Sequence, residues 1–259
     1  MKSRIDKTFQ RLRKSGGKAF IPYLMAGDPS LDKTVDIIRL FEESGADIVE
    51  LGIPFSDPLA DGPTIQRASE RALRNGVTLR KSISLVRVIR QTTEIPIVLM
   101  SYFNPIFRYG EEDFVRDAVG AGVDGVIIPD LPPDEAGEFI RHARKAAVDT
   151  IFLLAPTSTE KRIKKVVKAS RGFIYYVSIT GITGSLLSLD GSMESLISKI
   201  RRHTSMPIAV GFGVSTPEEA STISSIADGV IIGSALVRRL HESPDDLKKY
   251  LISLREAIK

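Results

Sequence analysis

The segment ELGIPFSDPLADG, residues 50–62, carries three carboxylates, Glu50, Asp57 and Asp61, among apolar and turn-forming residues. Glu50 lies in the apolar run ADIVELGIP, 46–54, which has the pattern of a strand. Side chains alternate along a strand, so the bulky neighbours of Glu50 would face surrounding helices and Glu50 would face the interior. Burial there raises the pKa of a carboxyl toward the range of a general acid or base. The alternative is a glutamate neutralised by a buried arginine or lysine, but no strand that we predict ends in a basic residue.

Asp57 and Asp61 follow Glu50 in a loop of turn-forming residues. Aspartate before proline or glycine is common in turns, and spacing alone favours a turn-forming role for Asp57. Asp61 also opens DGPTIQRASERAL, a loop that enters a helix at the rim faced by Glu50. A side chain there could reach a ligand, so the sequence leaves two roles open for Asp61, a turn former and a functional carboxylate.

Glycines gather where the last strands of the chain would end. GFGVSTPEEA carries Gly211 and Gly213 before a helix, and GVIIGSALVRRL carries Gly233 and Ser234 at the start of another. Glycine lets backbone N–H groups approach an anion, and a helix N-terminus adds a favourable dipole. Gly184, in TGITG, could add a further N–H. Such turns at neighbouring strand ends of a barrel predict a phosphorylated ligand.

These residues need a scaffold that brings several strand ends together. The chain supplies short apolar runs, rich in Ile and Val, separated by helical patterns. This alternation predicts an α/β fold, a (β/α)8 TIM barrel formed as one domain by residues 1–259. We expect an extra N-terminal helix beneath the barrel and long loops after strands 2 and 6. The strands are expected at 19–27, 46–54, 96–102, 124–130, 150–156, 173–178, 207–213 and 228–234.

The bulk composition fits a globular enzyme and argues against several other classes. Hydrophobic residues make up 42% of the 259 and charged residues 26%, and no stretch approaches the roughly 18 apolar residues of a membrane span. Cysteine is absent, so disulfides and thiolate metal sites are excluded. The N-terminus lacks the apolar core of a secretory signal, and we expect a cytoplasmic protein. The net charge of +4 comes without a nucleic-acid-binding signature, and the basic run 160–171 fits a solvated helix face.

Several other chemistries lack the residues that they need. No lysine on a predicted strand faces the barrel interior, which argues against a Schiff-base aldolase. His142, His203 and His241 lie in helical patterns without metal-ligand spacing, and no strand–GxGxxG–helix motif for a dinucleotide occurs. The residues alone therefore predict a barrel without metal or cofactor, which acts on a phosphorylated substrate by carboxylate acid–base catalysis.

The segment ELGIPFSDPLADGPTIQ resembles the signature of tryptophan synthase α subunits. The likeness covers essentially the whole chain, because FIPYLMAGDPS, LMSYFNP, GVIIPDLPPDE, TGITG, VGFGVS and IGSAL resemble further motifs of the family. The family cleaves indole-3-glycerol phosphate to indole and glyceraldehyde 3-phosphate, a retro-aldol reaction that needs no cofactor. The resemblance thus implies a carbon–carbon lyase of tryptophan biosynthesis.

The resemblance also implies roles for individual residues. Glu50 would protonate the indole ring carbon at the scissile bond and relay the side-chain hydroxyl proton. Asp61 would accept a hydrogen bond from the indole N–H, opposite the positive charge that protonation creates, and Tyr175 would lie near the substrate. The implied phosphate contacts are Gly184, Gly213, Gly233 and Ser234. The implied indole pocket comprises Tyr23, Ile65, Met100, Tyr102, Ile127 and Phe212.

A protein partner follows from the same resemblance. The family's α subunits work in an αββα complex, in which a β subunit carries pyridoxal phosphate and joins indole, received through a tunnel, to serine. The implied docking face comprises Asp57, Pro58, Asn104 and, in the LPP turn at 131–133, Pro132. The chain departs from the family in the loop after strand 6, where Ile179 stands at the place of a frequent arginine and Ser185-Leu186 at that of Ala-Arg. This more apolar loop is expected to close differently over the substrate.

Two other functions stay open on the sequence. The chain could be a free-standing indole-releasing lyase that needs no β subunit, or a non-catalytic protein that binds the phosphorylated ligand and regulates a partner. Because Glu50 and Asp61 are both present, the regulatory alternative is disfavoured. A sugar-phosphate isomerase of the same fold would not account for the SDPLADG loop.

Overall fold

The computed structural model describes residues 2–177, 191–211 and 213–259. Within these ranges the strands are β1 (Ala19–Met25), β2 (Val49–Gly52), β3 (Ile97–Met100), β4 (Gly125–Ile127), β5 (Asp149–Ile151), β6 (Leu153–Leu154), β7 (Ile174–Val177), β8 (Ile208–Gly211) and β9 (Gly229–Ile232). The helices are α1 (Arg4–Ser15), α2 (Leu31–Glu43), α3 (Pro63–Arg74), α4 (Leu79–Ile89), α5 (Phe103–Tyr109), α6 (Glu111–Ala121), α7 (Gly137–Lys145), α8 (Glu160–Ala169), α9 (Ser192–Arg201), α10 (Pro217–Ile226), α11 (Ser234–Glu242), η1 (Pro244–Asp246) and α12 (Leu247–Ala257).

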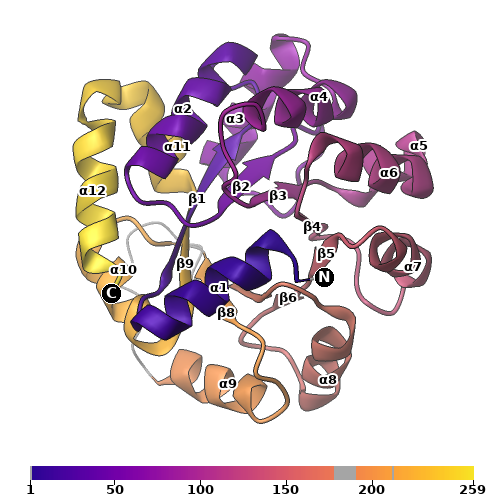
Figure 1. Cartoon of the computed structure of the whole chain (residues 1–259), viewed down its shortest axis with the longest axis vertical. Coiled ribbons are helices and arrows are strands. Elements are labelled where there is room, and N and C mark those ends of the chain that lie inside the picture. Colours follow the sequence, from indigo (N-terminus) through magenta and orange to yellow (C-terminus); the bar gives the residue numbers. More distant parts are fainter. Residues whose placement is uncertain (1, 178–190, 212) are drawn as a thin grey trace.

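All strand pairs are parallel, in the order β5-β4-β3-β2-β1-β9-β8-β7-β6. The segments β5 and β6 flank Phe152, so the predicted fifth strand is divided in two: β5 pairs with β4, and β6 pairs with β7. The ladder bridges this division, because the Tyr175 N–H donates to the Phe152 carbonyl at 3.1 Å. The strands therefore form a ring with helices outside it (Figure 1), and the predicted (β/α)8 barrel is confirmed.

Side chains of each strand divide between two apolar layers. Val49 and Leu51 pack in the layer between the strands and the helices, whereas Ile48 packs inside the barrel. The interior layer also contains Ile5 and Phe9 of α1. Figure 1 shows this helix, in indigo, lying across the middle of the ring, which confirms the N-terminal helix as a plug beneath the barrel.

The connections after β2 and β3 position the residues of the predicted site. The additional helix expected after β2 is present as α3. The strand expected at 96–102 is shorter than predicted: β3 ends at Met100, and α5 begins at Phe103. Pro105 sits in the first turn of α5, where a missing N–H breaks no helical bond. No helix in the described parts of the chain is long and apolar enough to cross a membrane.

Candidate active site

Glu50 faces the barrel interior, as its place in the strand predicts. It pairs in register with Tyr23 of β1 and Val98 of β3, and it is only 1% exposed. Its Oε2 atom has no hydrogen-bond partner, and among the described residues no arginine or lysine forms an ion pair with it. Burial, and next the charge of Asp61, raise the pKa of Glu50 to about 8. The carboxyl is therefore mostly protonated at neutral pH and can act as an acid.

Asp61 lies in the loop between β2 and α3, half-buried at the rim of the barrel. The Tyr102 hydroxyl, from the connection after β3, donates a hydrogen bond to its carboxylate and accepts one from the Ala60 N–H at 2.9 Å. Burial raises the pKa of Asp61 to about 6, although the Tyr102 hydrogen bond lowers it. At neutral pH Asp61 is thus mostly ionised while Glu50 is protonated. This end of the barrel therefore presents an acid, Glu50, and a base, Asp61, near enough for the charge of Asp61 to raise the pKa of Glu50.

Two tyrosines occupy space that glycines leave open on the neighbouring strand. A Cβ atom added to Gly52 would overlap the Tyr23 hydroxyl, and one added to Gly211 would overlap the Tyr175 hydroxyl. Both tyrosines are 5% exposed, and burial together with Glu50 and Asp61 raises their pKa values well above 10. Both hydroxyls are consequently neutral and able to donate. Sequence reasoning missed this use of Gly52 and Gly211, although each lies at an inward-facing strand position where a glycine is informative.

Two helices begin at the predicted phosphate-binding end, and side chains cap the N-terminus of α10 but not that of α11. At α10, Glu219 accepts the Ser215 and Thr216 N–H groups at 2.7 and 3.1 Å, which closes a capping box. At α11, Gly233 is the N-cap residue and no side chain caps the helix, so the first N–H groups from Ser234 onward are available to an anion. Of the predicted phosphate contacts, Gly233 and Ser234 lie at this open terminus.

Two other predicted phosphate contacts can be placed only in part. Gly213 is exposed, has a φ of 81°, and has nothing within 4 Å of the position of a Cβ, so its backbone is accessible. Gly184 lies outside the described residues, as do Ile179, Ser185 and Leu186 of the same loop.

The predicted indole pocket is brought together in part. Tyr23, Ile65 and Met100 belong to one apolar cluster at the barrel mouth, and Met100 also packs against the interior cluster that contains Ile127. Tyr102 lies at the same end of the barrel, where its hydroxyl contacts the Asp61 carboxylate. Phe212 lies outside the described residues.

The residues predicted to dock on a partner share the same end of the barrel, since the segments that carry them follow three successive parallel strands, Asn104 in α5 and the others in loops. Asp57 and Asn104 are exposed, and Pro58 and Pro132 are partly exposed. Beside them the structure exposes two large apolar side chains, Leu59 at 93% and Phe107 at 64%. Sequence reasoning missed Leu59 and Phe107, although an apolar residue within a polar loop was a readable signal for Leu59.

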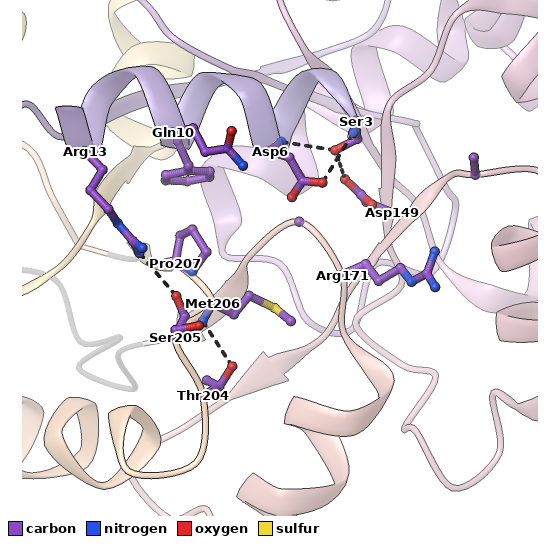
Figure 2. A pocket seen from close by; sticks show the side chains of 13 residues that line it. Ser3, Asp6, Gln10, Arg13, Asp149, Arg171, Thr204, Ser205, Met206 and Pro207 are labelled. Atoms are coloured by element: carbon purple, nitrogen blue, oxygen red, sulfur yellow. Dashed lines mark hydrogen bonds between the residues drawn. The ribbon is translucent and has the colours of Figure 1, made fainter. Parts of the chain in front are cut away.

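A separate cleft of about 470 Å³ lies at the opposite end of the barrel, beneath α1 (Figure 2). Figure 2 shows Ser3, the N-cap residue of α1, hydrogen-bonded to Asp6 of that helix and to Asp149, whose carboxylate accepts from the Ser3 hydroxyl at 2.6 Å. None of the predicted site residues that the structure describes lines this cleft. No group of three or more His, Asp or Glu residues suited to a metal ion occurs within the described ranges.

Known proteins resemble the chain over its full length. The family model described as "Tryptophan synthase alpha chain" matches residues 9–259. Curated relatives of the same name from Geotalea daltonii and Geobacter sulfurreducens are 52% and 50% identical, covering 99% of this chain and 97% and 99% of their own. A crystal structure of tryptophan synthase subunit alpha from Legionella pneumophila has a TM-score of 0.92 at 38% identity, over 100% of this chain and 99% of its own. A chain of M. tuberculosis tryptophan synthase, aminoacrylate-bound, has a TM-score of 0.91 at 38% identity over 100% of both chains.

Proposed function

The chain belongs to the tryptophan synthase alpha chain family, and we propose that Glu50 and Asp61 carry out the reaction of that family here. The chain is a lyase that cleaves indole-3-glycerol phosphate and passes indole to a β subunit for tryptophan synthesis. The observation that carries the residue assignment is the buried Glu50 carboxyl, which has an unpartnered oxygen and a pKa of about 8. A carboxyl kept neutral in this way is ready to give a proton to carbon.

Glu50 acts first as an acid and then as a base. Its proton goes to the indole ring carbon that holds the glycerol side chain, and the ring becomes a cation with its positive charge at nitrogen. The Glu50 carboxylate then accepts the proton of the hydroxyl on the adjacent side-chain carbon. The carbon–carbon bond breaks, its electron pair returns to the ring, and the hydroxyl carbon becomes the aldehyde of glyceraldehyde 3-phosphate. Glu50 ends protonated, so no cofactor or net proton is required.

Asp61 stabilises the cationic ring that the first proton transfer creates. Its pKa of about 6 keeps it ionised at neutral pH, so it can accept a hydrogen bond from the ring N–H as charge develops there. The Tyr102 hydroxyl holds the carboxylate in place, because it also accepts the N–H of Ala60, the residue before Asp61. Tyr175, neutral and buried beside Glu50, is suited to hydrogen-bond the substrate near the reacting carbon.

The phosphate binds at the open N-terminus of α11, through the backbone of Gly233 and Ser234, with Gly213 as a further contact. Gly184, the fourth contact that the resemblance implies, lies outside the described residues. Support comes from the contrast with α10, where the Glu219 carboxylate accepts the Ser215 and Thr216 N–H groups just before the helix and the Thr216 hydroxyl accepts the Glu219 N–H. The indole ring lies toward Ile65, Met100 and Ile127. This places ring and phosphate on different sides of the mouth and the scissile bond above Glu50.

The β subunit docks on the loops at the same end of the barrel, in an αββα complex. Asp57, Pro58, Asn104 and Pro132 form this face, and exposed Leu59 and Phe107 provide apolar surface that a partner would bury. Pyridoxal phosphate belongs to that partner, because the chemistry of this chain is complete with its own carboxylates. A cytoplasmic location accords with a biosynthetic role.

Steady-state cleavage of indole-3-glycerol phosphate by the purified chain, with and without a β subunit, tests the assignment. Glu50→Gln and Asp61→Asn keep the side-chain shapes and should each lower kcat by roughly a hundredfold or more. Asp57→Asn is the matched control, since it changes a carboxylate of the same loop that should matter only when the β subunit is present. Full cleavage by Glu50→Gln would refute the role of Glu50, and an inactive chain that still binds the substrate would favour the regulatory alternative.

A further inference from the structure

Tyr23 spans the barrel mouth between the two parts of the proposed site. It pairs with Glu50 in the β1–β2 register and faces the interior. Its Cβ atom would lie 3.5 Å from a Cβ on Gly233, at the phosphate end, and its hydroxyl lies over Gly52 of β2. Since Gly52 follows Glu50 by two residues on the same face, the hydroxyl lies one layer nearer the mouth than the Glu50 side-chain position.

Within the part of the chain that the structure describes, the Tyr23 hydroxyl has no strong hydrogen-bond acceptor. Its one recorded partner among the described residues is the Met25 thioether sulfur at 4.0 Å, which is a weak acceptor. The residue is nevertheless 5% exposed, and buried polar groups normally have good partners. Tyr102 differs, because its hydroxyl meets both the Ala60 N–H and the Asp61 carboxylate. An unsatisfied hydroxyl at a site mouth points to a partner that arrives with the ligand.

We propose that the Tyr23 hydroxyl hydrogen-bonds a hydroxyl group of the substrate's glycerol side chain. The inference rests on the proposed function, which places phosphate at Gly233 and the reacting ring carbon above Glu50. The glycerol chain must then run between these two points, which is the path that the Tyr23 ring follows. Tyr23 therefore has a polar role in addition to the apolar one that the family resemblance implies.

The hydroxyl acts as a hydrogen-bond donor and not as a base. Burial and the nearby carboxylates raise the pKa of Tyr23, so its proton stays in place at all working pH values. By fixing one substrate oxygen, Tyr23 orients the side chain relative to Glu50 for proton transfer. A ligand with ring and phosphate but no side-chain hydroxyl gains nothing from this contact.

Tyr23→Phe, which removes only the hydroxyl, tests the proposal through two ligands. One is indole-3-glycerol phosphate, and the other is 3-(indol-3-yl)propyl phosphate, which keeps ring and phosphate but lacks both glycerol hydroxyls. Affinities are measured by calorimetry in the Glu50→Gln background, so that the substrate is not consumed. Tyr23→Phe should weaken substrate binding about tenfold and leave the deoxy ligand within about twofold. In the chain with Glu50 intact, kcat/KM should fall roughly tenfold to a hundredfold.

Tyr109→Phe is the control, since it also removes only a phenolic hydroxyl, at the C-terminal end of α5, where that hydroxyl donates to Asp117 at 2.6 Å. It should leave both affinities and kcat/KM unchanged. Equal weakening of both ligands by Tyr23→Phe would show a packing role and overturn the proposal, as would full activity of that variant. Failure of the chain with Glu50 intact to cleave the substrate would instead refute the proposed function, and the affinity comparison would still decide whether Tyr23 recognises the hydroxyls.

Discussion

Glu50 at the C-terminal end of the barrel and Asp124 at its N-terminal end are both buried carboxylates, 1% and 6% exposed. Asp124 accepts the Ile97 N–H at 2.8 Å and pairs with Arg90 at 2.6 Å and Arg4 at 3.1 Å. Glu50 has an unpartnered oxygen and no ion pair among the described residues. Burial raises the pKa of both, but at Asp124 the Ile97 N–H and the arginines pull it back, while at Glu50 the charge of Asp61 adds to it.

The difference separates a carboxylate that stabilises the fold from one reserved for chemistry. Asp47, also at the N-terminal end, follows the Asp124 pattern with Arg11, Arg255 and the Phe20 N–H as partners. These groups connect α1 and α12 to the strands at the end of the barrel that α1 covers. Withholding donors from Glu50 destabilises its ionised form, and this keeps a proton available at neutral pH.

The largest expected effect is a gain in stability on removing the buried acid. The folded-state pKa of Glu50, about 8, exceeds its unfolded value near 4.5, so folding takes up a proton between these pH values and stability falls as pH rises. Glu50→Gln removes this cost, which reaches on the order of 4 kcal/mol at pH 8. Urea unfolding from pH 4 to pH 8.5 should show the two proteins diverging with pH. A constant difference would show that Glu50 is ionised in the folded chain.

The same kind of substitution, carboxylate to amide, should instead destabilise the protein at the N-terminal end of the barrel. Asp124→Asn turns an amide toward Arg90, which is only 10% exposed as a side chain, and removes the charge that two arginines share. We expect a loss of about 3 kcal/mol in the free energy of unfolding. The kcat per folded molecule should stay unchanged, because Asp124 lies away from the mouth. A stable but inactive Asp124→Asn protein would contradict the division between the two ends.

Asp149 is an intermediate case. It lines the cleft beneath α1 and accepts one short hydrogen bond, from the Ser3 hydroxyl (Figure 2). Burial is the largest cause that raises its pKa to about 6. The unfolded value is near 3.8, so Asp149 lowers stability progressively between about pH 4 and pH 6. Asp149→Asn should therefore stabilise the protein at pH 7 by about 3 kcal/mol, less than the roughly 4 kcal/mol expected for Glu50→Gln at pH 8. Thermal unfolding at pH 4 and pH 7 measures this, and a loss of stability at pH 7 would mean that the Ser3 bond outweighs burial.

The smallest expected effect is a change in the pH profile of kcat/KM. Activity requires ionised Asp61 and protonated Glu50, so the profile should be bell-shaped with limbs near pH 6 and pH 8, which belong to the coupled pair. Asp61→Asn removes the charge that helps to raise the pKa of Glu50, so in its residual activity the alkaline limb should move to lower pH. An alkaline limb that does not move would show that burial alone sets it.

Much of this arrangement could be predicted from the sequence because it is local. The period-two pattern around Glu50 predicted its inward orientation, and the alternation of strands and helices predicted the barrel. The partners of Asp61 could not be found this way, since Tyr102 comes from the next strand connection. The division of the fifth strand at Phe152 leaves no local signal, because the apolar run continues through it. The partners of Asp124 likewise come from distant segments, Arg4 from α1 and Arg90 from the C-cap of α4.

A carboxyl titration of Glu50 tests the central claim most directly. The chain labelled with 13C at the glutamate carboxyl carbon is titrated by NMR from pH 4 to pH 10, and Glu50→Gln identifies the resonance that disappears. A midpoint near 8 is the result that the account predicts, with a lower midpoint in Asp61→Asn. A midpoint near 4.5, the ordinary value of a glutamate, would mean that Glu50 is ionised at neutral pH and cannot be the acid that protonates indole.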